Sequence, residues 1–204
     1  MSPKWYPVHK VKYNIALPDP HMPPGRLHHA IFVQTKKDGS GTLYHVIGDI
    51  TSRRGMTYES KKTANPANSR SFHSRELLGY THSDFHPGRW NSILSSQPTP
   101  PQQKASNPKK HGRVEPFKEK INDHQYIFYE PEDERQPLWK CTEWVEWYAI
   151  PALQADGLIE AQVLDDSAEG QSWSSATEWI WDEAAQLHRY WDASANEWIW
   201  EGQE

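Results

Sequence analysis

A hairpin-like segment in the first quarter of the chain constrains the fold more than any other feature. Residues 28–35 are largely apolar and β-branched, and residues 42–50 are a second run of the same kind. The short turn Asp38-Gly-Ser-Gly41 joins them, and two such runs around a glycine-containing turn are typical of a β-hairpin. The sequence therefore predicts an antiparallel pair of strands, with residues 55–60 as a third strand.

The segments around this hairpin are rich in proline. Residues 1–25 contain six prolines, which predicts an extended arm lying over a surface. Residues 74–80 and 87–94 have the character of short helices. Residues 97–113 carry four more prolines and almost no apolar residues, so we expect a linker or a flap there.

A helical pattern surrounds the single cysteine. Cys141, Trp144, Val145 and Tyr148 are spaced i, i+3, i+4 and i+7, which places them on one face of an α-helix. Pro151 cannot lie deep in a continuing helix, because it lacks the N–H donor. It therefore marks a kink or the first turn of a second helix.

The end of the chain carries an aromatic repeat. Glu178-Trp-Ile-Trp-Asp182 recurs as Glu197-Trp-Ile-Trp-Glu201, with residues 187–192 between the two copies. Six of the 11 Trp lie beyond residue 170. Alternating aromatic segments of this length predict a three-stranded antiparallel meander.

These patterns predict an α+β protein in two parts. Residues 1–170 would form a small antiparallel sheet with the cysteine-bearing helix packed against it and a Pro-rich insert near residues 97–113. Residues 171–204 would form the Trp-rich β-meander.

Composition limits the compartment and the partners. No apolar run is long enough to span a membrane, and the N-terminus lacks the apolar core of a signal peptide. One cysteine cannot form an internal disulfide, which fits a reducing compartment. We therefore expect a cytoplasmic protein without a membrane span.

The formal charge of -5 is unevenly distributed along the chain. Residues 1–129 contain 19 basic and 9 acidic residues, whereas residues 130–204 contain 3 and 18. The basic residues are scattered, and the densest group, residues 104–113, has no aromatic side chains for base stacking. Binding of nucleic acid is therefore not expected, and the two charge types are more simply explained as solvated or mutually docked faces.

The single cysteine and an early histidine suggest a nucleophile and its base. A thiol attacks as thiolate, and the start of a helix can lower the pKa of Cys141. An imidazole at His28 could take the proton and return it to the leaving group. A further polar group must orient that imidazole, and His45 on the paired strand or Asp49 could do so. The opposing interpretation is structural, because Cys141 lies on the apolar face of its own helix and free cysteines are often buried.

The order of three short segments resembles a known superfamily. His28-His-Ala-Ile-Phe-Val33, Gly41-Thr-Leu-Tyr-His-Val46 and Lys140-Cys-Thr-Glu-Trp-Val145 are similar to the circularly permuted papain-like proteins, including NlpC-like and lecithin:retinol acyltransferase-like enzymes. The segments cover about a third of the chain, and Lys140 stands where these families usually have Asn.

This resemblance implies a permuted papain-like fold and a set of site residues. It implies Cys141 as the thiol nucleophile, His28 as the base and His45 as the orienting group, with Trp144 and His29 as candidate substrate contacts. Which of the adjacent His28 and His29 faces the site is left open by strand alternation.

The implied function is that of a cysteine-dependent hydrolase or acyltransferase. It would act on an ester or amide bond of a small-molecule, acyl or peptide substrate through a thioester, without a cofactor. The alternative is a non-catalytic binding module, in which the papain-like core is a scaffold and the Trp-rich tail binds a protein partner.

No metal site is expected from the sequence. His82 and His86 have the i, i+4 spacing of a zinc-binding helix. However, Gly79 and Pro87-Gly88 bracket them, and no further thiolate is available. Phosphate-binding glycine loops do not occur either.

Overall fold

The computed structural model describes residues 4–161, 180–182, 187–192 and 197–200. The chain divides into two compact units, Met1–Gln162 and Val163–Glu204. The predicted boundary between residues 170 and 171 lies outside the described residues. The protein is a mixed α/β protein whose sheets are antiparallel.

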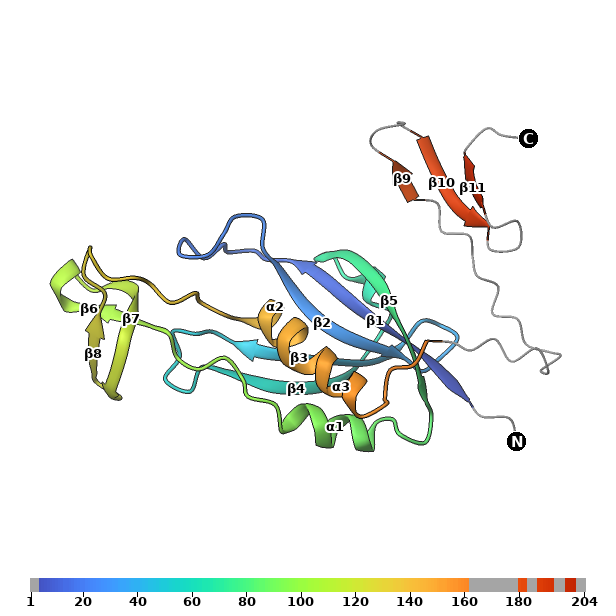
Figure 1. Cartoon of the computed structure of the whole chain (residues 1–204), viewed down its shortest axis with the longest axis horizontal. Helices are drawn as coiled ribbons and strands as arrows, with labels where there is room; N and C mark the ends of the chain where they lie inside the picture. Colours follow the sequence, from blue (N-terminus) through green and yellow to red (C-terminus); the bar gives the residue numbers. More distant parts are fainter. Residues whose placement is uncertain (1–3, 162–179, 183–186, 193–196, 201–204) are drawn as a thin grey trace. The chain divides into compact units, whose positions relative to one another are not determined.

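A five-stranded antiparallel sheet is the centre of the first unit (Figure 1). Its order is β4-β3-β2-β1-β5. The predicted hairpin is confirmed as β2 and β3, and the predicted third strand pairs with it as β4. The strands are β1 (Trp5–Asn14), β2 (Leu27–Gln34), β3 (Gly41–Gly48), β4 (Met56–Thr63) and β5 (Phe72–His82).

Two sequence-based predictions for this sheet are wrong. Residues 5–14 are not an arm but the strand β1, which lies between β2 and β5. Val8 and Val11 on its two faces are fully buried, so tertiary burial outweighs the neighbouring prolines. Residues 74–80 are not a helix but part of β5, because pairing with β1 outweighs local helical preference.

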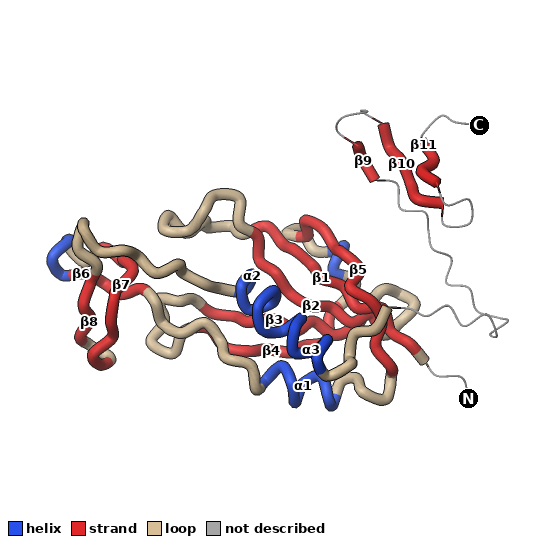
Figure 2. The backbone as a smooth tube through the Cα atoms, in the orientation of Figure 1, coloured by secondary structure: helices blue, strands red, loops and turns tan. Residues whose placement is uncertain are grey.

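Helices cover one face of this sheet (Figure 2). The predicted helix at 87–94 is confirmed as α1 (Gly88–Ser95). The cysteine-bearing helix consists of α2 (Cys141–Glu143), a π-helical segment (Trp144–Ala149) and α3 (Ile150–Ala155). Pro151 is the second residue of α3, directly after the π-helical segment, and it donates no backbone hydrogen bond there. Short 3₁₀ turns occupy Pro66–Asn68 and Pro108–Lys110.

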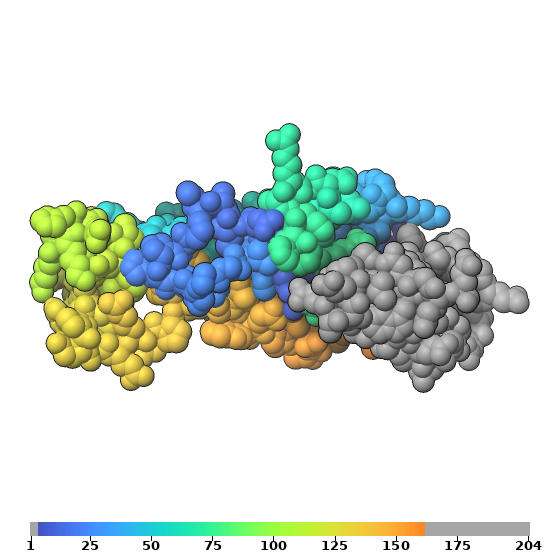
Figure 3. Space-filling view, turned by 90° about the horizontal axis from the view of Figure 1, so that it is seen from above, coloured from blue at the N-terminus to red at the C-terminus, as the bar shows by residue number. Residues whose placement is uncertain are grey.

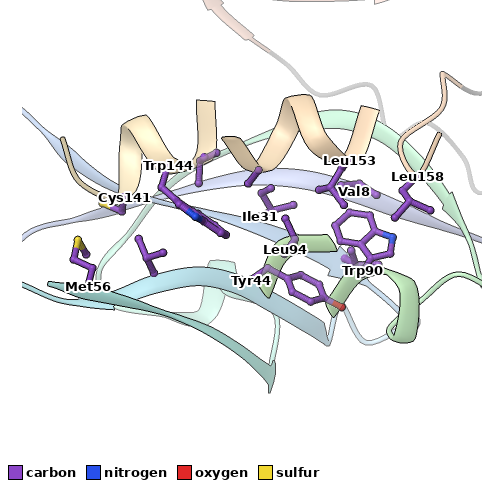
Figure 4. Close-up of a cluster of buried hydrophobic side chains, with 14 of the residues drawn as sticks. Val8, Ile31, Tyr44, Met56, Trp90, Leu94, Cys141, Trp144, Leu153 and Leu158 are labelled. Carbon is purple, nitrogen blue, oxygen red and sulfur yellow. The ribbon is translucent and has the colours of Figure 1, made fainter. Parts of the chain in front are cut away.

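The main core lies between these helices and the sheet (Figure 4). Trp144 from the cysteine-bearing helix and Trp90 from α1 are fully buried there against Ile31 and Tyr44 of the sheet. A smaller cluster consists of Val11, Ala30, Phe32 and Leu43. It lies on the other face of the sheet, because successive residues of a strand point to opposite faces.

The Pro-rich insert is part of a folded lobe rather than a flap. It contains β6 (Lys104–Asn107), which forms a second sheet with β7 (Arg113–Asn122) and β8 (Gln125–Phe128). Lys104 is 4% exposed, and its ammonium lies 2.7 Å from Asp19. This buried ion pair attaches the insert to the loop after β1. Figure 3 shows this lobe, in light green to yellow, at one end of the first unit.

The second unit contains the predicted aromatic meander. Its strands pair antiparallel in the order β11-β10-β9. They are β9 (Ile180–Asp182), β10 (Leu187–Asp192) and β11 (Glu197–Trp200). Residues 183–186 and 193–196, between these strands, lie outside the described residues.

No helix in the described part of the chain has both the length and the apolar character needed to cross a lipid bilayer.

A glycine at the hairpin provides a test of the sheet. A Cβ at Gly41 would overlap the carbonyl oxygen of Val33 on the paired strand, whereas one at Gly88 meets nothing within 4 Å. We expect Gly41→Ala to lower the free energy of unfolding by ~3 kcal/mol, because the backbone cannot yield. Gly88→Ala should change it by less than about 1 kcal/mol. Urea denaturation measures both, and equal values would contradict the described register.

Candidate active site

The site begins where two central strands separate. β2 and β3 pair from Gln34↔Gly41 to Ile31↔Tyr44, and their pairing stops there. The pairing of β2 with β1 continues to Asn14↔Leu27, and the pairing of β3 with β4 continues to Gly48↔Met56. The sheet is therefore open between residues 27–30 and 45–48.

Three side chains form a hydrogen-bonded chain across this opening. Nε2 of His28 lies 3.0 Å from Nδ1 of His45, and Nε2 of His45 lies 2.9 Å from a carboxylate oxygen of Glu59. His45 and Glu59 are register partners on β3 and β4. The predicted pairing of His28 with His45 is thus present in the structure.

Strand alternation separates His28 from His29. His28 shares a face of β2 with Ala30 and Phe32, whereas His29 shares the other face with Ile31. The ring of His29 faces the helix instead, with Nδ1 3.5 Å from Glu146. His28 is the histidine that joins the hydrogen-bonded chain.

Cys141, His28 and His45 line the same cavity, which has a volume of about 690 Å³. Its wall includes Leu43 from the smaller cluster and Met56 from the main core, so it reaches both sides of the opening. Cys141 begins the helix beside Met56 (Figure 4). The other lining residues are Tyr13, Asn14, Ile15, Leu17, Gly48, Asp49, Lys61, Thr63, Ala64, Asn65, Pro66, Asn68, Ser69, Ser71 and Lys140.

Burial dominates the ionisation of the thiol. Cys141 is 5% exposed, and desolvation raises its pKa above the ordinary value. Backbone hydrogen bonds from His29 and Thr142 and the charge of Arg26 act in the opposite direction but do not outweigh it. The prediction that the helix start lowers this pKa is therefore wrong, and the resting sulfur is a thiol.

The histidines of the site are neutral at pH 7. Burial lowers the pKa of His28 to about 4, with the nearby His45 and Lys61 acting in the same direction. Burial also lowers the pKa of His45, although its hydrogen bond to Glu59 opposes the shift. The same hydrogen bond, followed by that of Lys61, lowers the pKa of Glu59, which is a carboxylate. A neutral imidazole that lines the same cavity as a thiol has the protonation state of a proton acceptor.

Ion pairs hold the start of the cysteine-bearing helix. Glu143 accepts a hydrogen bond of 2.7 Å from the backbone N–H of Lys140 and forms a two-point ion pair with Arg26. The Lys140 ammonium lies 2.8 Å from Asp19 and 3.3 Å from Asp49. Burial alone would raise the pKa of Asp19, but the two lysine ammonium groups hold it well below its usual range.

The two further predicted site residues have other roles. Asp49 binds Lys140 and the backbone N–H of Thr51, and His45 takes the orienting position. Trp144 is fully buried in the core, with its ring 6.0 Å from that of Tyr58, and it is not part of the cavity wall. Trp144 is thus a packing residue and not a substrate contact.

Sequence reasoning missed Glu59. The sequence predicts a strand at residues 55–60, but this pattern alone does not give its register with the preceding strand. Counting outward from the hairpin shows which residue faces His45. An acidic residue opposite a histidine on paired strands was the available signal.

His82 and His86 are not on a common helix. His82 ends β5, and His86 lies 2.8 Å from the Tyr44 hydroxyl. Among residues that the structure describes, no group of three His, Cys, Asp or Glu side chains is placed to hold a metal ion.

Buried neutral histidines predict that acid destabilises the fold. Burial lowers the pKa of His9, His28 and His86 to about 4, below the value near 6.5 of an unfolded histidine. Between these values the unfolded state binds more protons, so stability is complete above about pH 6.5 and falls toward pH 4. At pH near 5, each of these histidines should lower the free energy of unfolding by about 1–2 kcal/mol relative to its value above pH 6.5.

Urea denaturation at pH 7.5 and pH 5 measures this loss. His86→Gln should flatten the pH dependence, because it removes one titrating group. His124→Gln, at an exposed position, is the control and should leave the dependence unchanged. A stability that does not change between the two pH values would contradict the neutral, buried state of these histidines.

The fold and the site define a mixed α/β protein in which a thiol and a histidine pair line the same cavity. Over residues 15–160 the chain matches the model of a family of unknown function (DUF6540). The match covers more than half of the chain, and the protein belongs to this family. No curated protein and no solved structure gives a significant match.

Proposed function

We propose that the protein is a cysteine-dependent hydrolase or acyltransferase that acts on ester or amide bonds. Cys141 is the nucleophile, His28 the general base and His45 the group that orients it. One observation carries the proposal: the His28–His45–Glu59 chain opens onto the same 690 Å³ cavity as the only cysteine of the sequence. A cysteine nucleophile needs an adjacent base that is itself oriented.

The arrangement also supports a permuted papain-like fold. In such a fold a histidine strand, a second histidine strand and a later cysteine-bearing helix meet at one site. Here β2, β3 and the helix from Cys141 follow that chain order and share the cavity. The additional strands β1 and β5 and the second sheet are features of this chain.

The reaction follows from a neutral imidazole and a protonated thiol. As the sulfur of Cys141 attacks the substrate carbonyl carbon, its proton passes to His28 and the carbonyl π electrons move to oxygen. When the carbonyl re-forms, the bond to the alcohol or amine breaks, and this leaving group takes the proton from His28. Water or another acceptor then attacks the thioester with His28 again as base, which releases the acyl product and restores the thiol.

A second cavity provides space for an acceptor or for the rest of the substrate. It has a volume of about 410 Å³ and shares Asn14, Ile15, Leu17 and Lys140 with the first. Its further wall is largely apolar and includes Met22. This space next to the first cavity supports acyl transfer as well as hydrolysis.

Acylation by a small activated ester tests the proposal. The native protein is mixed with 4-nitrophenyl acetate, and intact mass spectrometry follows the acetyl group while absorbance follows released nitrophenol. We expect acetylation at Cys141 and release of more than one equivalent of nitrophenol. Cys141→Ala should abolish both. The urea-unfolded protein is the control for the intrinsic reactivity of the thiol. A native protein that stays unmodified while the unfolded one is acetylated would contradict the proposal.

The second candidate function is a non-catalytic binding module, and the burial of Cys141 favours it. A thiol that is 5% exposed and has a raised pKa is typical of a packed structural cysteine. In that case the cavities would hold a ligand without reacting with it. Failure of native acetylation, together with a loss of stability in Cys141→Ala, would favour this function over catalysis.

A further inference from the structure

Glu59 ends the hydrogen-bonded chain that starts at His28. Its carboxylate lies 2.9 Å from Nε2 of His45, and the ammonium of Lys61 lies 3.1 Å from the same carboxylate. We infer that Glu59 is a positioning residue that fixes the tautomers of both histidines. As a result, Nδ1 of His28 is the nitrogen that accepts the proton of the thiol. This inference rests on the proposed role of His28.

The first tautomer follows from the chemistry of a carboxylate. Ionised carboxylate oxygens accept hydrogen bonds and cannot donate them. At 2.9 Å from Glu59, Nε2 of His45 must therefore carry the hydrogen. A neutral imidazole has one N–H, so Nδ1 of His45 carries a lone pair.

The second tautomer follows from the first. Nδ1 of His45 lies 3.0 Å from Nε2 of His28 and can only accept a hydrogen bond. Nε2 of His28 is then the donor, and its Nδ1 is left with the free lone pair. Of the four ring nitrogens in this pair, only Nδ1 of His28 is free to accept a proton.

The chain also stabilises the charge that forms during the reaction. When Nδ1 of His28 accepts the thiol proton, the ring becomes an imidazolium that donates to His45. His45 in turn donates to the negative charge of Glu59. Without a carboxylate at position 59 the ring of His45 can turn over or change tautomer. His28 could then present an N–H instead of a lone pair to the cavity.

Nuclear magnetic resonance of the histidine ring nitrogens tests the tautomers directly. In ¹⁵N-labelled native protein at pH 7, we expect Nε2 of both His28 and His45 to be protonated and Nδ1 of both to be unprotonated. Glu59→Gln replaces the carboxylate by an amide that both donates and accepts. We expect it to abolish the single-tautomer pattern of His45 and to lower the rate of iodoacetamide alkylation of Cys141 by about tenfold.

Glu76→Gln is the matched control. Glu76 also forms an ion pair with a lysine, Lys10 at 2.9 Å, but it lies on β5 at the other edge of the sheet. This variant should keep both the tautomers and the alkylation rate. Protonation of Nδ1 of His45 in the native protein, or an unchanged pattern in Glu59→Gln, would overturn the inference.

The two readouts separate this inference from the proposed function. If Cys141 is not acylated but the ring nitrogens have the expected pattern, the proposed function fails and the tautomer assignment stands. If Cys141 is acylated but the pattern is absent, the role of Glu59 fails and the proposed function stands.

Discussion

Replacing Trp144 by alanine should lower the free energy of unfolding by about 3–5 kcal/mol. The side chain has no exposed area and lies in the main core, one turn after Cys141. Its removal loses the burial of a large aromatic ring and leaves a cavity between the helix and the sheet.

Trp147→Ala is the matched control for this effect. Trp147 lies on the same helix, three residues further along, but its side chain is 60% exposed. Urea denaturation should show a change of less than about 1 kcal/mol in this variant. Equal losses in Trp144→Ala and Trp147→Ala would contradict the described packing of the helix.

Replacing His28 by alanine should slow alkylation of Cys141 at pH 7 by about 100-fold or more. The thiol itself has a raised pKa, so its reactivity at this pH depends on transfer of its proton to a neutral imidazole. His45→Ala should produce a smaller loss in the same direction, because the base remains but loses its hydrogen-bond partner.

His29→Ala is the control for a neighbouring imidazole. Its ring faces Glu146 on the helix rather than the cavity, and the backbone N–H near the thiol is retained. Iodoacetamide labelling followed by mass spectrometry measures the rates. A loss in His29→Ala as large as in His28→Ala would show that the assigned base is wrong.

The sequence predicted the elements that are specified by residues close together in the chain. The hairpin of β2 and β3 has both alternation and a glycine turn, and the helix at Cys141 has a clear apolar face. β1 and β5 were mispredicted because their strand character comes from pairing with each other across about 60 to 80 residues. The sequence does not reveal the folded insert because most of its buried side chains are polar, among them Lys104, whose ammonium pairs with Asp19.

The candidate site was also predicted only in part. The order of the segments and the hairpin predicted that His28 and His45 lie close together. In the structure their rings are within hydrogen-bond distance. Glu59 was missed because it depends on the register of a third strand. The raised pKa of Cys141 could not be foreseen, because desolvation is set by all the residues that surround the sulfur.

The central claim is that His28 activates the thiol of Cys141, and the pH dependence of alkylation tests it most directly. Iodoacetamide rates are measured from pH 3.5 to pH 10 in the native protein and in His28→Ala. In the native protein we expect the rate to rise through the pKa of His28, about 4, and to be nearly constant by pH 6. In His28→Ala the rate should rise only with ionisation of the thiol itself, at a pH above that of an ordinary cysteine. Superimposable profiles that both rise only at alkaline pH would contradict the claim.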